Sequence, residues 1–206
     1  MPHLDAFQPD CFFHAYNHAV GSENLFRNSE NYRFFLRRYT EYLRPVLRTY
    51  AHCLMPNHFH LLVQVRDEES LRMHHEALKD RPAPADWDVH DFVMQQFSNF
   101  FNSYARSFNR VFNRRGALFV DYLKRELVET EEYFTTLVSY IHQNPVHHGF
   151  CRVLTDWPHS SYASLLNGAP ASEERAYLME WFGGQEAFQR FHEINQPVRQ
   201  DWEFNK

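Results

Sequence analysis

The sequence lacks several features that would each have narrowed its function. It has only 3 cysteines, Cys11, Cys53 and Cys151, an odd and scattered set that excludes a disulfide framework and is typical of reduced thiols in a cytoplasmic protein. No apolar run approaches the roughly 20 residues of a membrane span. Residues 1–5 contain no basic region that leads into an apolar core, so no signal peptide is expected. Basic residues (21) do not outnumber acidic ones (26), which argues against a uniformly basic nucleic-acid binder.

The charge is nevertheless unevenly distributed. Residues 101–125 carry six basic residues against the single acid Asp121, whereas residues 66–91 and 156–206 each carry eight acids against four bases. A local basic stripe of this kind can follow a phosphate backbone, although a solvated helix face is the commoner explanation of a charge run. The predicted DNA-contacting residues are Arg106, Arg110, Arg114, Arg115, Lys124 and Arg125.

The chain length fits one domain with a tail, and we expect an α+β domain over residues 1–168 followed by an acidic helical extension over residues 169–206. The predicted order is strand, helix, strand, strand, polar insert, helix, strand, helix. The expected strands cover 11–20, 47–55, 58–65 and 122–128, and the expected helices follow caps at Asn28 or Ser29, Asp86 or Asp88, and Thr130. The insert covers 66–87, with a short helix at 70–79, and the extension has helices near 171–182 and 185–194. Pro145 disfavours helical geometry at Asn144, so the helix after Thr130 is expected to end there.

The strand at 58–65 carries the first candidate site. His58 and His60 are two apart, so they point to the same face of a strand, while Phe59 points toward the core. Two imidazoles on one face of a rigid strand form half of a site for a divalent metal. A polar face on an ordinary strand is the alternative, and the spacing alone leaves both open.

The helix after Thr130 offers a complement to this pair. Tyr140 and Asn144 are four apart and therefore share one face of that helix. The Asn144 oxygen is the expected third ligand to Mg²⁺ or Mn²⁺, and the Tyr140 hydroxyl is the expected nucleophile toward a phosphodiester. A tyrosine packed against the sheet and a C-terminal cap are the alternatives, and Tyr133 is a rival nucleophile.

Four segments in the same order resemble the REP-associated branch of the single-tyrosine transposases, over residues 11–168. They are residues 54–62, 116–119, 140–146 with Gly149, and 157–162. The resemblance implies a ferredoxin-like βαββαβ core with an antiparallel sheet and helices on one face. It implies metal-dependent cleavage and rejoining of structured single-stranded DNA through a 5′-phosphotyrosine, without ATP. The implied roles are metal ligand for His58, His60 and Asn144, and nucleophile for Tyr140.

Other functions and assemblies stay open at this point. His18 stands where that branch often carries arginine, and no arginine or lysine directly follows Pro145. A non-catalytic nucleic-acid-binding module with the same fold is the alternative function, and a metal hydrolase with water as nucleophile is a weaker one. The chain is expected to act on a DNA hairpin or repeat as a monomer or a homodimer, because some single-tyrosine transposases exchange the tyrosine helix between subunits.

Overall fold

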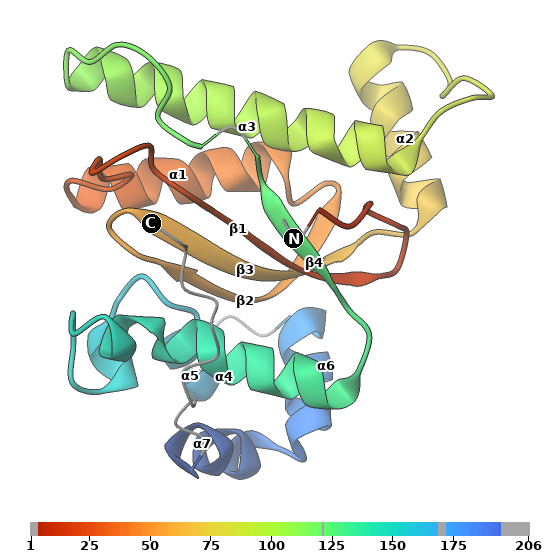
Figure 1. Ribbon diagram of the computed structural model, residues 1–206. Coiled ribbons are helices and arrows are strands. Elements are labelled where there is room, and N and C mark those ends of the chain that lie inside the picture. The colour runs from red at the N-terminus through yellow and green to blue at the C-terminus, as the bar shows by residue number, and fades with distance from the viewer. Residues whose placement is uncertain (1–3, 121, 169–171, 195–206) are drawn as a thin grey trace.

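A four-stranded antiparallel sheet organises the chain, and the computed structural model describes residues 4–120, 122–168 and 172–194 (Figure 1). The strands are β1 (Phe12–His18), β2 (Leu47–Leu54), β3 (His58–Val65) and β4 (Lys124–Val128). Their order across the sheet is β2-β3-β1-β4, the arrangement of a ferredoxin-like βαββαβ core. The predicted fold class is therefore confirmed, and all four strands lie within the predicted ranges.

Two helices of this core cover one face of the sheet, as predicted. They are α1 (Ser29–Tyr42), capped by the Asn28 side chain, and α3 (Val89–Val111), capped by Asp88. Phe35 of α1 packs edge-on against the rings of Phe100 and Tyr104 of α3, with ring centroids 4.8 and 5.2 Å apart. The apolar stripes of both helices thus close over the same sheet face.

The opposite face of the sheet is also covered, so the prediction of helices on one face holds for the core alone. The covering elements are α4 (Glu131–His147), a 3₁₀ turn (Leu154–Asp156), α5 (Tyr162–Asn167) and α6 (Glu173–Phe182), and α7 (Gln185–Ile194) packs against α4 and α6 on their side away from the sheet (Figure 1). Leu62 and Val128 explain this third layer, because they are buried side chains on the second face. A sheet that is apolar on both faces needs cover on both.

Helix α4 does not end at Asn144, as the proline rule had predicted, but continues through Pro145 to His147. The amides that follow supply the closing hydrogen bonds, from His148 N–H to the Asn144 carbonyl at 3.0 Å and from Phe150 N–H to the Pro145 carbonyl at 2.8 Å. Pro145 is buried, although its ring removes one hydrogen bond from the helix. Asn144 therefore lies inside a helix and is buried.

The insert and the extension fold as short helices. Helix α2 (Glu68–Lys79) occupies the predicted position, and its His75 ring packs with Trp87 and Phe92 at the start of α3. The two extension helices are confirmed, while residues 169–171 and 195–206 of that prediction lie outside the described residues. Within the described ranges, no helix is long and apolar enough to cross a membrane, and the three cysteines are free thiols.

Candidate functional site

Strands β1 and β3 are neighbours, and their pairing builds a row of polar side chains on the face toward α4. His60 is paired with Tyr16, and His58 is paired with His18. His58 and His60 do share one face, with ring centroids 5.2 Å apart, while Phe59 lies in the core on the other side. The strand periodicity therefore predicted the orientation of this histidine pair correctly.

Helix α4 brings the other two predicted residues to the histidines. Asn144 Oδ1 lies 3.5 Å from His58 Nε2, and the half-buried Tyr140 ring meets the His60 ring edge-on at a centroid distance of 5.4 Å. Asn144 Nδ2 donates to the Tyr140 carbonyl at 3.2 Å, which holds the amide in place. The four residues meet within one chain, although Tyr140 and His60 are 80 positions apart in the sequence.

The donor atoms of this site fit a divalent cation. Two ligands about 2.1 Å from one ion lie about 3.0 Å apart in octahedral and about 3.4 Å apart in tetrahedral geometry. The 3.5 Å separation between His58 Nε2 and Asn144 Oδ1 is close to this range. Burial lowers the pKa of His58 to about 4 and the pKa of His60 well below its usual value, so both are neutral at pH 7, the form that binds metals.

The side-chain oxygen of Asn144 would complete the set of protein ligands. In the described part of the chain, no group of three or more His, Cys, Asp or Glu side chains is placed to hold a metal ion. Asn144 Oδ1, 3.5 Å from His58 Nε2, is close enough to serve as the third protein ligand of a cation at His58 and His60. Imidazole and oxygen donors together suit manganese at least as well as magnesium.

Tyr133, the rival nucleophile, faces a different partner. Its hydroxyl donates to Glu126 on β4 at 2.8 Å. Burial, followed by this hydrogen bond, raises its pKa above the ordinary value of tyrosine, which opposes formation of a phenolate. The geometry therefore favours Tyr140.

Two of the predicted DNA-contacting arginines have structural partners instead. Arg125 is buried, with 8% of its surface exposed, and donates to the carbonyls of Asp5 and Leu123 at 2.6 and 3.2 Å. Arg114 donates to Glu23 at 2.8 Å and to the Ala117 carbonyl at 2.6 Å. Arg125 ties the N-terminal segment to β4, and its burial rules out the predicted phosphate contact in this conformation.

The other basic residues of the stripe lie on accessible surfaces. Arg106 and Arg110 lie toward solvent on α3, and Arg115 is exposed in the loop that follows it. That loop pairs with the end of β1 beside the site, because Val120 N–H donates to the His18 carbonyl at 3.0 Å. Lys124 lies on the site face of the sheet, with its ammonium 5.7 Å from the Tyr16 ring centroid.

Three further residues of the site escaped the sequence reasoning. His14 Nε2 lies 2.9 Å from His60 Nδ1, Asn57 Oδ1 lies 2.9 Å from His58 Nδ1, and the exposed His148 ring lies 5.1 Å from the His58 ring. The sequence held a usable signal for His14, because it lies two residues before Tyr16, the partner of His60 across the strand pair, and therefore on the same face. That signal could be used only if the first strand was known to pair with the strand that carries His58 and His60.

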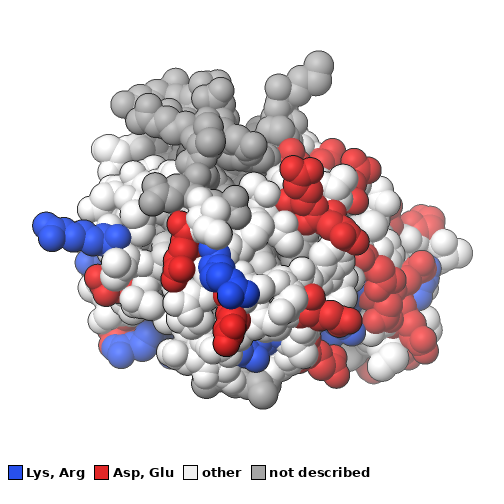
Figure 2. Space-filling model, turned by 90° about the horizontal axis from the view of Figure 1, so that it is seen from below, with Lys and Arg blue, Asp and Glu red and all other residues white. Residues whose placement is uncertain are grey.

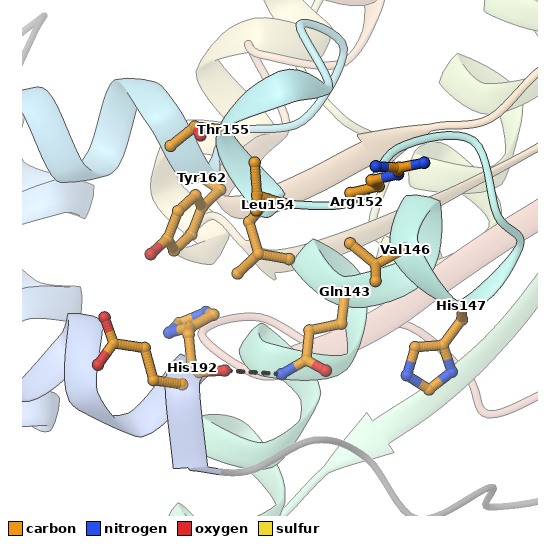
Figure 3. A pocket seen from close by; sticks show the side chains of 10 residues that line it. Gln143, Val146, His147, Arg152, Leu154, Thr155, Tyr162 and His192 are labelled. Carbon is orange, nitrogen blue, oxygen red and sulfur yellow. Dashed lines mark hydrogen bonds between the residues drawn. The ribbon is translucent and has the colours of Figure 1, made fainter.

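A cavity of about 600 Å³ lies beside the C-terminal end of α4 (Figure 3). Its lining includes Gln143, His147, Arg152, Tyr162 and His192. Gln143 Nε2 crosses toward α7 and donates to the His192 carbonyl at 3.1 Å. None of the four predicted catalytic and metal-binding residues lines this cavity, so it is separate from the candidate site.

The side of the molecule formed by α4, α6 and α7 gathers acidic side chains (Figure 2). Exposed acids there are Glu131, Glu132, Glu173, Glu180, Glu186 and Glu193. A polyanion is repelled from such a surface and attracted to the exposed arginines at the end of α3.

Comparison with known proteins agrees with the motifs. No family model matches the sequence. A Haemophilus influenzae protein provisionally named REP-associated tyrosine transposase is 27% identical over 116 residues, which is 55% of this chain. The match spans only 58% of that relative's length.

A solved structure shares the fold at lower identity. It is the REP-associated tyrosine transposase bound to a REP hairpin, with a TM-score of 0.57 and 14% identity. The alignment covers 81% of this chain and 86% of the solved chain. The chain is thus similar to REP-associated tyrosine transposases in fold and in part of its sequence.

Proposed function

We propose that this protein is a metal-dependent tyrosine transposase that cleaves and rejoins structured single-stranded DNA through a 5′-phosphotyrosine. The observation that carries the proposal is the meeting of Tyr140, His58, His60 and Asn144 within one chain. A tyrosine beside two neutral imidazoles and an amide oxygen suits phosphoryl transfer at a cation site better than it suits packing.

The chemistry follows from what these side chains can do. The Tyr140 oxygen attacks the phosphorus and loses its proton, the bond to the 3′ oxygen breaks, and that oxygen leaves as a free 3′ hydroxyl after protonation. A divalent cation at His58, His60 and Asn144 would polarise the scissile phosphate and stabilise the departing oxygen. The new ester retains the bond energy, so a second 3′ hydroxyl can attack it and rejoin the strand without ATP.

The DNA-contacting surface of this proposal is narrower than the predicted stripe. Arg106, Arg110 and Arg115 would contact phosphates at the end of α3, and Lys124 would lie along the strand that enters the site. A hairpin with single-stranded flanks is the proposed substrate, because the neighbour of the same fold is described as bound to a REP hairpin.

Covalent trapping tests the proposal. Purified protein with Mn²⁺ is incubated with a set of hairpin oligonucleotides labelled on either end. The 3′-labelled fragment should become attached to the protein and survive denaturing electrophoresis, while the 5′-labelled fragment is released with a 3′ hydroxyl. Tyr140→Phe and His58→Ala should abolish the adduct. Tyr133→Phe, two turns away on the same helix, is the matched control and should retain it.

The same assay separates the alternatives. Salt-sensitive binding without any adduct or cleavage would support a non-catalytic nucleic-acid-binding module. Cleavage without a protein-linked fragment, retained in Tyr140→Phe, would support a hydrolase that uses water.

A further inference from the structure

We propose that His14 and Asn57 are positioning residues, which hold His60 and His58 in the tautomers and orientations that a cation requires. This inference rests on the proposed function, because it concerns the same site. Neither residue would touch the cation or the DNA phosphate. Each would act through the ring nitrogen of a histidine that faces away from the site.

Asn57 fixes the tautomer of His58. Its Oδ1 lies 2.9 Å from His58 Nδ1 and can only accept, so Nδ1 must carry the proton. His58 Nε2 then presents a lone pair toward Asn144 Oδ1, 3.5 Å away. The Asn57 backbone is fixed as well, because its carbonyl accepts from Ala19 N–H at 2.8 Å.

With this tautomer, the two atoms that face each other across the site are both hydrogen-bond acceptors. His58 Nε2 and Asn144 Oδ1 are both acceptors in this tautomer, so no proton is shared between them. The Asn144 amide is turned this way by its own hydrogen bond from Nδ2 to the Tyr140 carbonyl. Both atoms can offer a lone pair to a cation, which is the arrangement that ligation by His58 and Asn144 requires.

His14 has the equivalent position behind His60. Its Nε2 lies 2.9 Å from His60 Nδ1, and the two rings are stacked with centroids 5.1 Å apart. His14 is fully buried, and its ring also stacks on Tyr16 at a centroid distance of 4.6 Å. A cation bound at His60 Nε2 requires the proton on Nδ1, which makes His14 Nε2 its acceptor.

The expected effect is a loss of metal affinity. Groups that bind the second nitrogen of a metal-ligating histidine typically contribute about 10- to 100-fold in affinity. His14→Phe and Asn57→Ala remove the acceptor and should each raise the Kd for Mn²⁺ by about that factor. His14→Gln and Asn57→Asp keep an acceptor oxygen in reach and should stay much closer to the parent protein.

The test measures Mn²⁺ binding directly, without DNA, by the electron paramagnetic resonance signal of the free ion. Thermal unfolding in EDTA confirms that each variant is folded. A purely structural role would lower the unfolding temperature but leave the Kd of the folded protein unchanged, and that result would overturn the inference. If His14→Phe does not fold, the comparison of Asn57→Ala with Asn57→Asp decides the question.

Failure of the two proposals can be told apart. If the parent protein binds no Mn²⁺, both this inference and the metal dependence of the proposed function are refuted. If the parent protein binds Mn²⁺ and forms the phosphotyrosine adduct while His14→Phe and Asn57→Ala bind Mn²⁺ equally well, only this inference is refuted.

Discussion

Acid should weaken the attachment of α7 to α4, through the buried histidine that joins them. His192 Nδ1 lies 2.8 Å from the Phe188 carbonyl, which can only accept, so Nδ1 carries the proton. His192 Nε2 must then accept from His142 Nδ1 at 2.9 Å, and His142 Nε2 from the Ser161 hydroxyl at 2.8 Å. Because the Phe188 carbonyl can only accept, it fixes the position of each proton in this series of hydrogen bonds. The series also requires His192 to be neutral, because Nε2 must accept.

The size of the effect follows from the pKa of His192. Burial lowers it from 6.5 to about 4 in the folded protein. Because the folded pKa is depressed, this stability is fully present above pH 6.5 and is lost as the pH falls toward 4. For a shift of this size, the free energy of unfolding should lose about 2 kcal/mol by pH 5 and about 3 kcal/mol by pH 4.

Urea denaturation of the parent protein and of His192→Gln, at pH 7.5, 6.5, 5.5 and 5, measures this contribution. The glutamine oxygen can still accept from His142 but does not titrate in this range. Buried histidines that do not contact His192 affect both proteins alike, and the pKa of His142 is lowered mainly by burial, which the substitution leaves in place, so the difference between the two curves reports on His192. The parent protein should lose about 2 kcal/mol more than the variant between pH 7.5 and 5. Parallel curves would refute the reasoning.

Three further predictions concern charge and backbone. The double variant Arg106→Gln, Arg110→Gln should weaken hairpin binding and lower the salt slope by about 1 for each phosphate that is no longer neutralised, measured by filter binding. Arg190→Gln on α7 is its control and should change neither. Arg125→Met should lower the free energy of unfolding by about 2–3 kcal/mol in urea and leave the salt slope unaltered, because its carbonyl partners would be left without their donor. Gly149→Ala should lower the free energy of unfolding by about 1 kcal/mol, because φ is +71° at this position and a side chain disfavours that backbone conformation. The loss should be no larger, because the added methyl group would meet no neighbouring atom. An unchanged urea midpoint would contradict this prediction.

The alternation of strand residues made the fold and the orientation of the histidine pair predictable. A period of two is a local property, so the common face of His58 and His60 could be inferred without any partner strand. The contact between His14 and His60 could not, because it depends on the pairing of strands 46 positions apart. The spacing of four between Tyr140 and Asn144 offered these residues as a complement to the histidine pair, and the sequence motifs supported that connection.

The failed predictions share one physical cause, which is that tertiary contacts overrode a local rule. Pro145 disfavours helix locally, yet α4 continues past it to His147, with Asn144 and Pro145 themselves buried. Arg125 is as cationic as Arg106, but alternation along β4 turns it into the core side of the sheet, where backbone carbonyls accept from it. The sequence gives the number of basic residues in a segment, but the packing determines which of their side chains are accessible to a phosphate.

The extra turn of α4 also explains how the site can be held together. Because Asn144 lies inside the helix, its amide and Tyr140 are joined by a hydrogen bond within one rigid element and must move as a unit. The opposite side of the same turn carries His142 and Gln143, which are held through Ser161 and the His192 carbonyl. The sheet thus fixes the two histidines, and the extension fixes the helix that faces them. Disruption of the extension would therefore misplace nucleophile and amide together, whereas removal of the Asn57 or His14 side chain would disturb only the histidines.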